Sequence, residues 1–339
     1  MIVFDKVYGE FEINEPVLIN LLNSKTLNRL NGISMAGFYP AYPQISSDDM
    51  SRYYHSIGVF LLLRKYGASL EEQIAGLIHD VSHTAFSHTV DYIKEDMEEQ
   101  KNQSGQDDIH ENFVKNSDIA EILKNHSIDI DYILEDKHFT LKENNIPDIC
   151  ADRIDYSLRQ GFVLYNVIDE KEKNKILDSL INNNGTFMFK DFETAKFFAE
   201  FFWKMDDMEW SGMKSAIMFA ISGKLFQRAI EMQYVTFDDF YNFNDKVIIE
   251  KIKNNLDNDP VLKKYFEYLN LPVEKYENDK KNYIRQVFCK VRKIDPQFIS
   301  NNGKLLRVSD IDLEFRNKIK NKNRFNEYFI KLSEWTIAN

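Results

Sequence analysis

Three of the chain's seven histidines and one aspartate fall within ten residues, at His79, Asp80, His83 and His88. An apolar run that begins at Ile74 precedes them and favours a buried helix. On a helix, the adjacent His79 and Asp80 project about 100° apart, and His83 lies one turn further along the face that carries His79. Imidazole nitrogens and carboxylate oxygens are ligands of divalent transition metals. The stretch therefore predicts a metal site at the C-terminal end of a helix.

Two more residues complete the predicted ligand set. His55 lies in the middle of a helical segment upstream, and Asp152 lies on a predicted helix downstream. With His79 and Asp80 they supply two imidazoles and two carboxylates, and they leave coordination positions for water and a substrate. We therefore predict that these four residues bind a divalent metal ion. The donor set suits Mn, Fe, Co, Ni or Zn, and Mg less well, so the identity of the metal stays open.

The elements that position these residues are mostly helices. Apolar spacing predicts a helix over 52–66, which carries His55, and Ser69 caps the next helix with Glu72 completing a capping box. A short helix over 148–160 carries Asp152. The other predicted elements are a hairpin over 2–13, helices over about 16–32, 110–124, 192–208, 212–233, 247–255 and 309–335, a helix capped by Thr236, strands over 186–190 and 283–294, and an exposed acidic loop over 94–109.

The composition agrees with a helical globular protein. The chain has 339 residues with 43% apolar and 29% charged residues, but only 12 glycines and 7 prolines. We therefore predict a mainly α fold with small β additions, the N-terminal hairpin and C-terminal strands. The expected organisation is a core over 1–165 that carries the metal site, and a helical C-terminal part over 166–339 with a small β element, packed as one unit.

Charge and cysteine content limit the function classes. A net charge of -11 argues against a surface that coats nucleic acid or binds an anionic membrane. Two cysteines give no disulfide framework and fit a reducing compartment. The first residues lack the basic-then-apolar order of a signal peptide, and no apolar run approaches the roughly 20 residues of a membrane span. We expect a soluble cytoplasmic protein.

The order His55, His79-Asp80, Asp152 resembles the H…HD…D signature of the HD-domain metal-dependent phosphohydrolases. The surrounding text is similar to the deoxynucleoside triphosphate triphosphohydrolase (dNTPase) clade within them. The similarity rests on Arg52-x-x-His55-Ser56-x-Gly58-Val59, on Ile74 to His88, on His110-Glu111 and on Ala151-Asp152-Arg153-Ile154-Asp155-Tyr156. It is strong over about residues 25–160 and implies an HD-domain helical core.

The resemblance implies a role for each matching residue. It assigns the metal to His55, His79, Asp80 and Asp152. It places four catalytic residues around the reacting phosphorus, and these are His83, His88, Asp91 and His110. It assigns phosphate and sugar contacts to Arg52, Arg153 and Tyr156, and it matches a substrate-binding lysine at Lys214. The implied reaction converts a dNTP to a nucleoside and triphosphate in a homo-oligomer, with a nucleotide or another phosphate ester as the only expected partner besides the metal.

Two positions depart from the dNTPase pattern. Met35 stands where the clade has a glutamine that reads the 3′-hydroxyl of the sugar, and Gln160 stands where it has an aspartate serving the same sugar. A methionine cannot replace an amide in hydrogen bonding a hydroxyl. A nucleoside monophosphate or another phosphate ester therefore stays open as substrate, as does a non-catalytic nucleotide sensor. A diiron oxygenase would need further histidine ligands, for which the sequence offers His110, His126 and His138.

Overall fold

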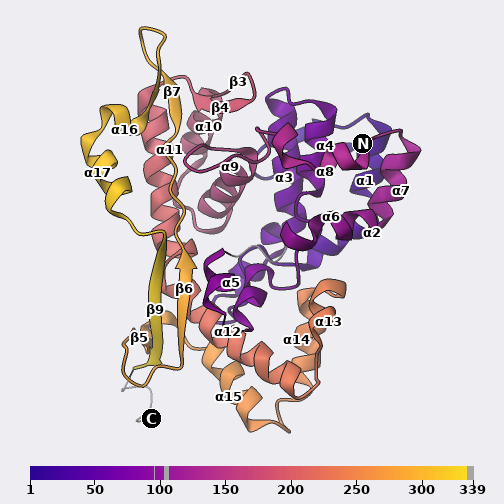
Figure 1. Cartoon of the computed structure of the whole chain (residues 1–339), viewed down its shortest axis with the longest axis vertical. Coiled ribbons are helices and arrows are strands. Elements are labelled where there is room, and N and C mark those ends of the chain that lie inside the picture. Colours follow the sequence, from indigo (N-terminus) through magenta and orange to yellow (C-terminus); the bar gives the residue numbers. More distant parts are fainter. Residues whose placement is uncertain (95, 103–106, 334–339) are drawn as a thin grey trace.

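Helices dominate the computed structural model, which describes residues 1–94, 96–102 and 107–333 (Figure 1). Three small β-sheets accompany them in the described part of the chain. The predicted fold class, mainly α with small β additions, is therefore confirmed. The search for membrane spans, made over the same residues, finds no helix that is both long and apolar enough to cross a bilayer.

The N-terminal half is a hairpin followed by short helices. Strand β1 (Ile2–Asp5) pairs with β2 (Gly9–Glu12) in antiparallel fashion, as predicted. The helix predicted over 16–32 is divided, because Ser24 leaves the helical conformation and caps a second helix through its hydroxyl. The helices of this half are α1 (Pro16–Leu22), α2 (Lys25–Arg29), α3 (Arg52–Lys65), α4 (Leu70–Ile78), α5 (Met97–Asn102), α6 (Asp107–Lys115), α7 (Asp118–Asn125), α8 (Ile130–Leu134) and α9 (Ala151–Leu158).

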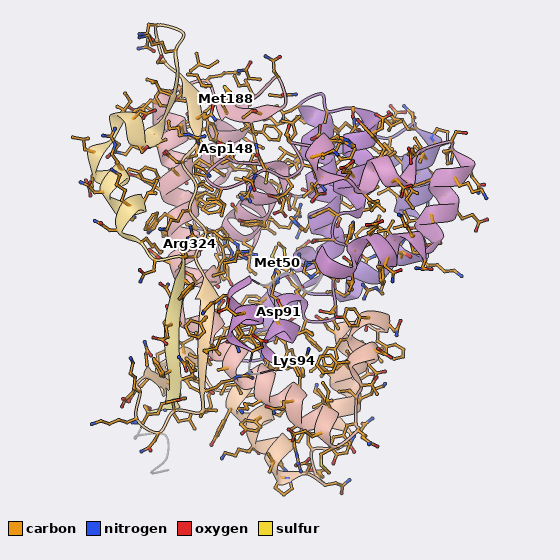
Figure 2. All side chains as sticks on the ribbon, in the orientation of Figure 1. Met50, Asp91, Lys94, Asp148, Met188 and Arg324 are labelled. Atoms are coloured by element: carbon orange, nitrogen blue, oxygen red, sulfur yellow. The ribbon has the colours of Figure 1, made fainter. Side chains whose placement is uncertain are left out.

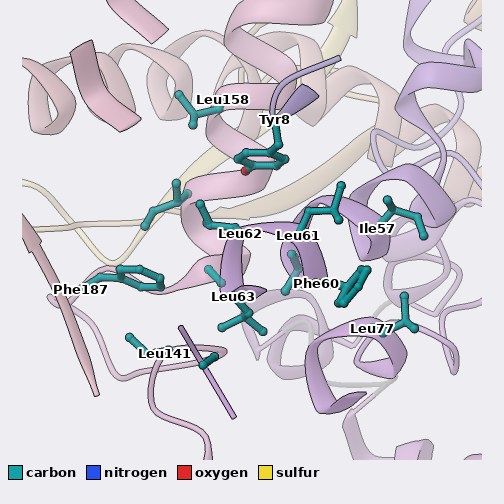
Figure 3. Packing of buried hydrophobic residues seen from close by; sticks show 14 of the residues in the cluster. Tyr8, Ile57, Phe60, Leu61, Leu62, Leu63, Leu77, Leu141, Leu158 and Phe187 are labelled. Atoms are coloured by element: carbon teal, nitrogen blue, oxygen red, sulfur yellow. The ribbon is translucent and has the colours of Figure 1, made fainter. Parts of the chain in front are cut away.

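Helix α3 is the centre of the larger of two hydrophobic cores. It begins at Ser51, whose hydroxyl accepts the amide of Tyr54, and it ends before Gly67, which has a φ of +72°. From His55 to Leu63 every residue of the helix is buried, and Figure 3 shows Phe60 and its neighbours packed among residues of α4, α9 and the N-terminal hairpin. A helix that is buried on all sides lies in the centre of a core. The core therefore fixes α3, α4 and α9 against one another.

The C-terminal half adds longer helices and two sheets. Its helices are α10 (Glu170–Ser179), α11 (Phe192–Met205), α12 (Met213–Glu231), α13 (Phe237–Asn242), α14 (Asp245–Lys253), α15 (Pro260–Leu269), α16 (Val308–Ile311) and α17 (Leu313–Asn321). Its strands are β3 (Leu180–Asn183), β4 (Thr186–Phe189), β5 (Tyr276–Asn278), β6 (Arg285–Lys290), β7 (Gln297–Ile299), β8 (Leu305–Arg307) and β9 (Phe325–Leu332). The strand orders are β3-β4-β7-β8 and β5-β9-β6.

A second core lies around α12. Its apolar residues come from α12, α14, α15, β6 and β9, and also from Ala85 to Ile93, which follow the histidine-rich stretch. In Figure 1 these elements form the lower part of the molecule, below the N-terminal helices. The first core extends as far as Met205 in α11. The division of the chain at residue 165 stays a prediction.

Three further predicted elements are wrong. The helix predicted over 110–124 is divided into α6, which ends at Lys115, and α7, which begins at Asp118. The segment over 94–109 was predicted as a loop, but α5 and the beginning of α6 lie within it, and Gln100 and Val114 are buried on those helices. Residues 95 and 103–106 of that prediction lie outside the described residues. The helix predicted over 309–335 is instead α16, α17 and strand β9, because Phe325–Leu332 pairs with β5 and β6. Residues 334 and 335 also lie outside the description.

Candidate metal centre

Three predicted metal ligands converge on one point. His55, His79 and Asp152 each offer a donor atom, and these atoms lie within 4.8 Å of one another. His55 Nε2 is 2.9 Å from Asp152 Oδ1 and 3.3 Å from His79 Nε2, while His79 Nε2 is 3.6 Å from Asp152 Oδ1. Asp80 completes the set, with an oxygen 3.4 Å from His79 Nε2 and another 3.7 Å from His55 Nε2. Neighbouring ligands about 2.1 Å from a metal are separated by about 3 Å, so the spacing suits one ion.

The second nitrogen of each imidazole fixes which nitrogen faces the centre. Nδ1 of His55 donates to Asp155 Oδ2 at 2.7 Å, and Nδ1 of His79 donates to the carbonyl of Gly76 at 2.8 Å. When both rings are neutral, each therefore turns the lone pair of its Nε2 toward the centre, an arrangement that a cation stabilises. Burial lowers the pKa of His55, but hydrogen bonds to Asp152 and Asp155 outweigh it and raise this pKa to about 9. The donor set thus attracts positive charge, as a metal site must.

The local structure around His79 differs from the prediction. Helix α4 ends at Ile78, and His79 is its C-cap residue. Asp80 and His83 therefore lie in the turns after the helix, and His83 does not follow His79 on a helical face as predicted. Capping of α4 also differs, because Ser69 accepts the Glu72 amide while the Glu72 carboxylate binds the backbone at residues 141 and 142. The metal ligands nevertheless meet, since the turn brings Asp80 back toward α3.

A buried chain of charges supports His55 from behind. Asp155, which orients His55, also accepts two hydrogen bonds from Arg159, at 2.9 and 3.0 Å, and Arg159 donates at 2.9 Å to Asp5 of the N-terminal hairpin. The side chains of Asp5, Asp155 and Arg159 are at most 1% exposed. Opposite charges that alternate in this way offset the cost of their burial. The hairpin is thereby connected to the metal centre through two carboxylates and one guanidinium.

Gly58 makes room for this chain of charges. A Cβ atom built at Gly58 would lie 1.9 Å from Asp155 Oδ1 and 2.3 Å from Arg159 Nη2. Any side chain at this position of α3 would therefore displace the carboxylate that holds His55. The glycine three residues after His55 in the R-x-x-H-S-x-G-V pattern thus has a packing reason.

Arg52 holds Asp80 in place. Its Nη1 donates to Asp80 Oδ2 at 2.6 Å and its Nε donates to the Ser87 hydroxyl at 2.9 Å, with both partners buried. Burial raises the pKa of Asp80, but Arg52 and the neighbouring histidines outweigh this effect and hold it well below its usual range. Asp80 is therefore anionic at neutral pH, as a metal ligand needs to be. Arg52 lies beside the candidate donor set and shares its charge with Asp80, while its predicted contact with a substrate phosphate stays a prediction.

The predicted catalytic residues lie on the next turns of the chain. His83 Nε2 is 3.4 Å from Asp80 Oδ1, and the rings of His83 and His88 are 5.1 Å apart in an edge-to-face arrangement. Nδ1 of His88 is 3.3 Å from Asp91 Oδ2, which leaves Nε2 of His88 for a substrate. Figure 2 labels Asp91 near the middle of the molecule, above α12. Burial, followed by the charge of Arg52, lowers the pKa of His83 well below its usual value, so this imidazole is neutral.

His110 reaches the same region from α6. Its Nδ1 lies 2.9 Å from the Ser82 hydroxyl. Burial, and after it the charge of Lys142, lower the pKa of His110 to about 4. His110 is therefore neutral at pH 7 and can accept or donate one hydrogen bond, but it does not bring a positive charge to the site.

A cavity of about 1180 Å³ opens beside the metal centre. Most of the predicted residues line it, and these are Arg52, His55, His79, Asp80, His83, His88, His110, Asp152, Arg153, Tyr156 and Lys214. Arg153 pairs with Glu143 at 2.8 Å, and Lys214 pairs with Glu209 at 2.8 Å on another wall. The prediction missed Lys142, Tyr165 and Trp210, which also line the cavity. No spacing pattern marked these three, because distant segments bring them there.

The two departures from the dNTPase pattern also line the cavity. Met35 presents an apolar side chain that is almost fully buried. The amide oxygen of Gln160 accepts a hydrogen bond of 2.7 Å from the indole of Trp210, whose ring lies edge-on to Tyr156. Gln160 is therefore partly occupied in holding an aromatic wall. A ligand hydroxyl would meet fewer side-chain acceptors here than in a site with both polar groups.

His126 and His138 lie away from the candidate metal centre. Nε2 of His126 lies 2.9 Å from the Asn20 amide at the surface, and the ring of His138 stacks on Tyr132. Within the described residues, the other group with metal-ligand spacing consists of Glu143, Cys150 and Asp152. Arg153 contacts both Glu143 and Cys150, so a guanidinium already supplies positive charge there. Of the three histidines offered for a second iron, His126 and His138 have contacts away from the centre, while His110 lines the same cavity as the donor set.

Helices α3, α4 and α9, with an H…HD…D donor set at their junction, define a protein of the HD class. The HD domain model matches residues 52–159. The chain is 30% identical over 244 residues to the metal-dependent phosphohydrolase cns2 of Cordyceps militaris. This match spans 68% of this chain and 67% of that protein. On this basis the chain belongs to the HD-domain family of metal-dependent phosphohydrolases.

Two further comparisons extend the likeness. The chain is 39% identical over 209 residues to the uncharacterized protein YdhJ of Bacillus subtilis, a match that spans 60% of this chain and 61% of that protein. A crystal structure of a phosphohydrolase from Bacteroides thetaiotaomicron superposes with a TM-score of 0.74 over 98% of this chain and 100% of that one, at 16% identity. At 16% identity, the likeness to the Bacteroides thetaiotaomicron structure shows a shared fold.

Proposed function

We propose that the protein hydrolyses a nucleotide phosphate ester with a divalent metal bound by His55, His79, Asp80 and Asp152. The observation that carries the proposal is the convergence of these donors at one end of a cavity that also holds histidines and paired cations. In the clade that the sequence resembles, the precedent is conversion of a dNTP to a nucleoside and triphosphate. Cytoplasmic location and assembly into a homo-oligomer belong to the same proposal.

The proposed chemistry divides simply between metal and protein. A divalent ion in such a donor set lowers the pKa of bound water and polarises a phosphoryl oxygen. In the proposed step, a water molecule that has released one proton to solvent forms a bond from its oxygen to phosphorus, the ester P–O bond breaks, and the leaving oxygen takes a proton. His88, oriented by Asp91, is placed to carry that proton on Nε2. His83 and His110, which are neutral, are suited to hydrogen bonding of phosphate oxygens.

A second candidate substrate is a nucleoside monophosphate or another organic phosphate ester. Met35 and the hydrogen bond between Gln160 and Trp210 favour it, because they weaken recognition of a sugar hydroxyl. The rings of Tyr156 and Trp210, which lie edge to face, still give the cavity an aromatic wall, and a base or another ring can stack on one of these rings. Both candidates use the same metal and the same histidines.

A panel of substrates separates these possibilities. Release of phosphate, pyrophosphate and triphosphate would be measured from ribo- and deoxyribonucleoside mono-, di- and triphosphates with Mn, Mg, Fe or Co. The variant His79→Ala/Asp80→Ala serves as the blank. We expect release that depends on added metal and disappears in the blank. Triphosphate from dNTPs would support the dNTPase precedent, and phosphate from monophosphates would support the second candidate. Metal-independent release, or equal release by the blank, would refute the proposal.

A further inference from the structure

Lys142 is a buried cation in the wall of the cavity, between η5 (Asp136–His138) and α9. Its side chain is 8% exposed, which is rare for lysine, because removing an ammonium from water is costly unless the group is paired. Among the residues that the structure describes, its Nζ contacts one carboxylate, that of Asp136, whose side chain is 69% exposed. An ion pair with so exposed a partner is screened by water and contributes little. Lys142 therefore retains capacity to bind a second anion.

Three other cations of the cavity are more fully committed. Arg52 binds the metal ligand Asp80, and Lys214 binds Glu209, a carboxylate that is itself nearly buried. Arg153 donates to Glu143 and to the carbonyl of Asn144. An ammonium carries three donor hydrogens, and the contact to Asp136 uses one of them. Among these four cations, Lys142 is the one whose charge is least offset by a buried partner.

The backbone of Lys142 is fixed to both sides of the metal centre. Oε1 of Glu72, on α4, accepts the amides of Leu141 at 2.8 Å and Lys142 at 3.0 Å. The carbonyl of Leu141 accepts the Ala151 amide at 2.7 Å, and that of Lys142 accepts the amide of Asp152 at 3.3 Å. Helix α4 leads into His79, and α9 carries Asp152. The position of Lys142 relative to the metal donors is therefore held by four hydrogen bonds.

We propose that Lys142 binds a phosphate oxygen of the substrate beside the metal, and that Glu72 is the positioning residue that holds it there. The inference rests on the proposed function, because it assumes a phosphate ester in this cavity. A fixed ammonium at the cavity wall suits a tetrahedral anion, to which it acts as a point charge with several donors. Lys142 would then neutralise charge on the phosphate group, while Arg52 remains with Asp80.

The test is binding of inorganic phosphate to the Mn-loaded protein, measured by calorimetry for the wild type and Lys142→Met. Loss of a charged hydrogen bond should weaken phosphate binding by about 10- to 100-fold. Mn affinity of Lys142→Met should stay within about threefold of the wild type. Lys142→Arg should recover much of the phosphate affinity. Lys137→Met removes the same charge from a cavity-lining side chain that is 69% exposed, and it should weaken phosphate binding by less than about threefold.

Kinetics separate failure of this inference from failure of the proposed function. If the wild type hydrolyses a phosphate ester, Lys142→Met should raise its KM by a factor similar to the loss of phosphate affinity. Unchanged KM and unchanged phosphate affinity in a folded Lys142→Met variant would overturn the role of Lys142 while leaving the hydrolase proposal intact. An equal loss in Lys137→Met would also overturn it, by showing a general effect of charge. A wild type that binds neither phosphate nor phosphate esters would refute both.

Discussion

Substitution of Asp155 tests how the protein supports His55 at the candidate metal centre. It lies outside the donor set but accepts the Nδ1 hydrogen of His55 at 2.7 Å, and both side chains are at most 1% exposed. Asp155→Asn keeps the shape of the side chain and an oxygen that can accept the same hydrogen. It removes the negative charge that makes the imidazole a stronger donor to the metal. The change therefore tests electrostatic support of His55 with little change in packing.

The expected loss follows from the type of contact. Groups that orient a metal-bound histidine typically change metal affinity by about 10- to 100-fold when they are mutated. At 25 °C this range corresponds to about 1.4–2.7 kcal/mol. The upper end applies here because the pair is fully buried and water cannot replace the lost charge. Arg159 keeps Asp5 as its partner in the variant, so one ion pair behind the site remains.

The assay is titration of metal-free protein with Mn or Zn in competition with a chromophoric chelator. Asp206→Asn is a matched control, because Asp206 is also buried and accepts a hydrogen bond from Ser211. Its other partners are the backbone amide of Arg292 and the ammonium of Lys322, which lie outside the donor set. The control should keep wild-type metal affinity. If folded Asp155→Asn binds metal as tightly as the wild type, the reasoning that links Asp155 to the centre is refuted.

Two further predictions concern the same centre. Gly58→Ala should destabilise the protein by about 1–3 kcal/mol and weaken metal binding, because the new methyl group overlaps Asp155. In Gly76→Ala, on α4, the new methyl group meets mainly the end of the Leu63 side chain, so stability and metal affinity should fall less than in Gly58→Ala. Thermal unfolding and metal titration of both variants check this, and equal losses would contradict the packing argument. Metal affinity should fall about tenfold per pH unit below pH 8, because His55, with a pKa of about 9, must release its proton to the solvent when metal binds. Calorimetry in buffers of different ionisation enthalpy would detect that proton, and a pH-independent affinity would contradict the prediction.

The sequence predicts those elements that local signals determine. Ser51 and Ser69 cap the beginnings of α3 and α4, and Thr236 caps α13 as predicted, with Asp239 completing a capping box there. Strand β9 could not be predicted in this way, because its pairing with β6 depends on a segment some 40 residues earlier. The acidic composition of 94–109 hid two short helices whose buried residues are few.

The same distinction holds for the site. Histidine and aspartate spacing predicted a donor set that the fold brings together, although α4 ends before His79. The support behind it escaped prediction, since Asp5 and Arg159 are separated by 154 residues and meet only in the folded core. Lys142 escaped for a similar reason, because Glu72 fixes its backbone from 70 residues away. Local pattern identifies the ligands, and tertiary packing determines what supports them.

The central claim is that His55, His79, Asp80 and Asp152 hold the metal at the phosphate-binding cavity. Anomalous diffraction from crystals of the Mn-loaded protein tests it most directly. We expect one anomalous peak about 2.2 Å from Nε2 of His55, Nε2 of His79 and one oxygen of each aspartate. A peak among Glu143, Cys150 and Asp152 instead, or no peak at the predicted position in Mn-loaded crystals, would contradict it.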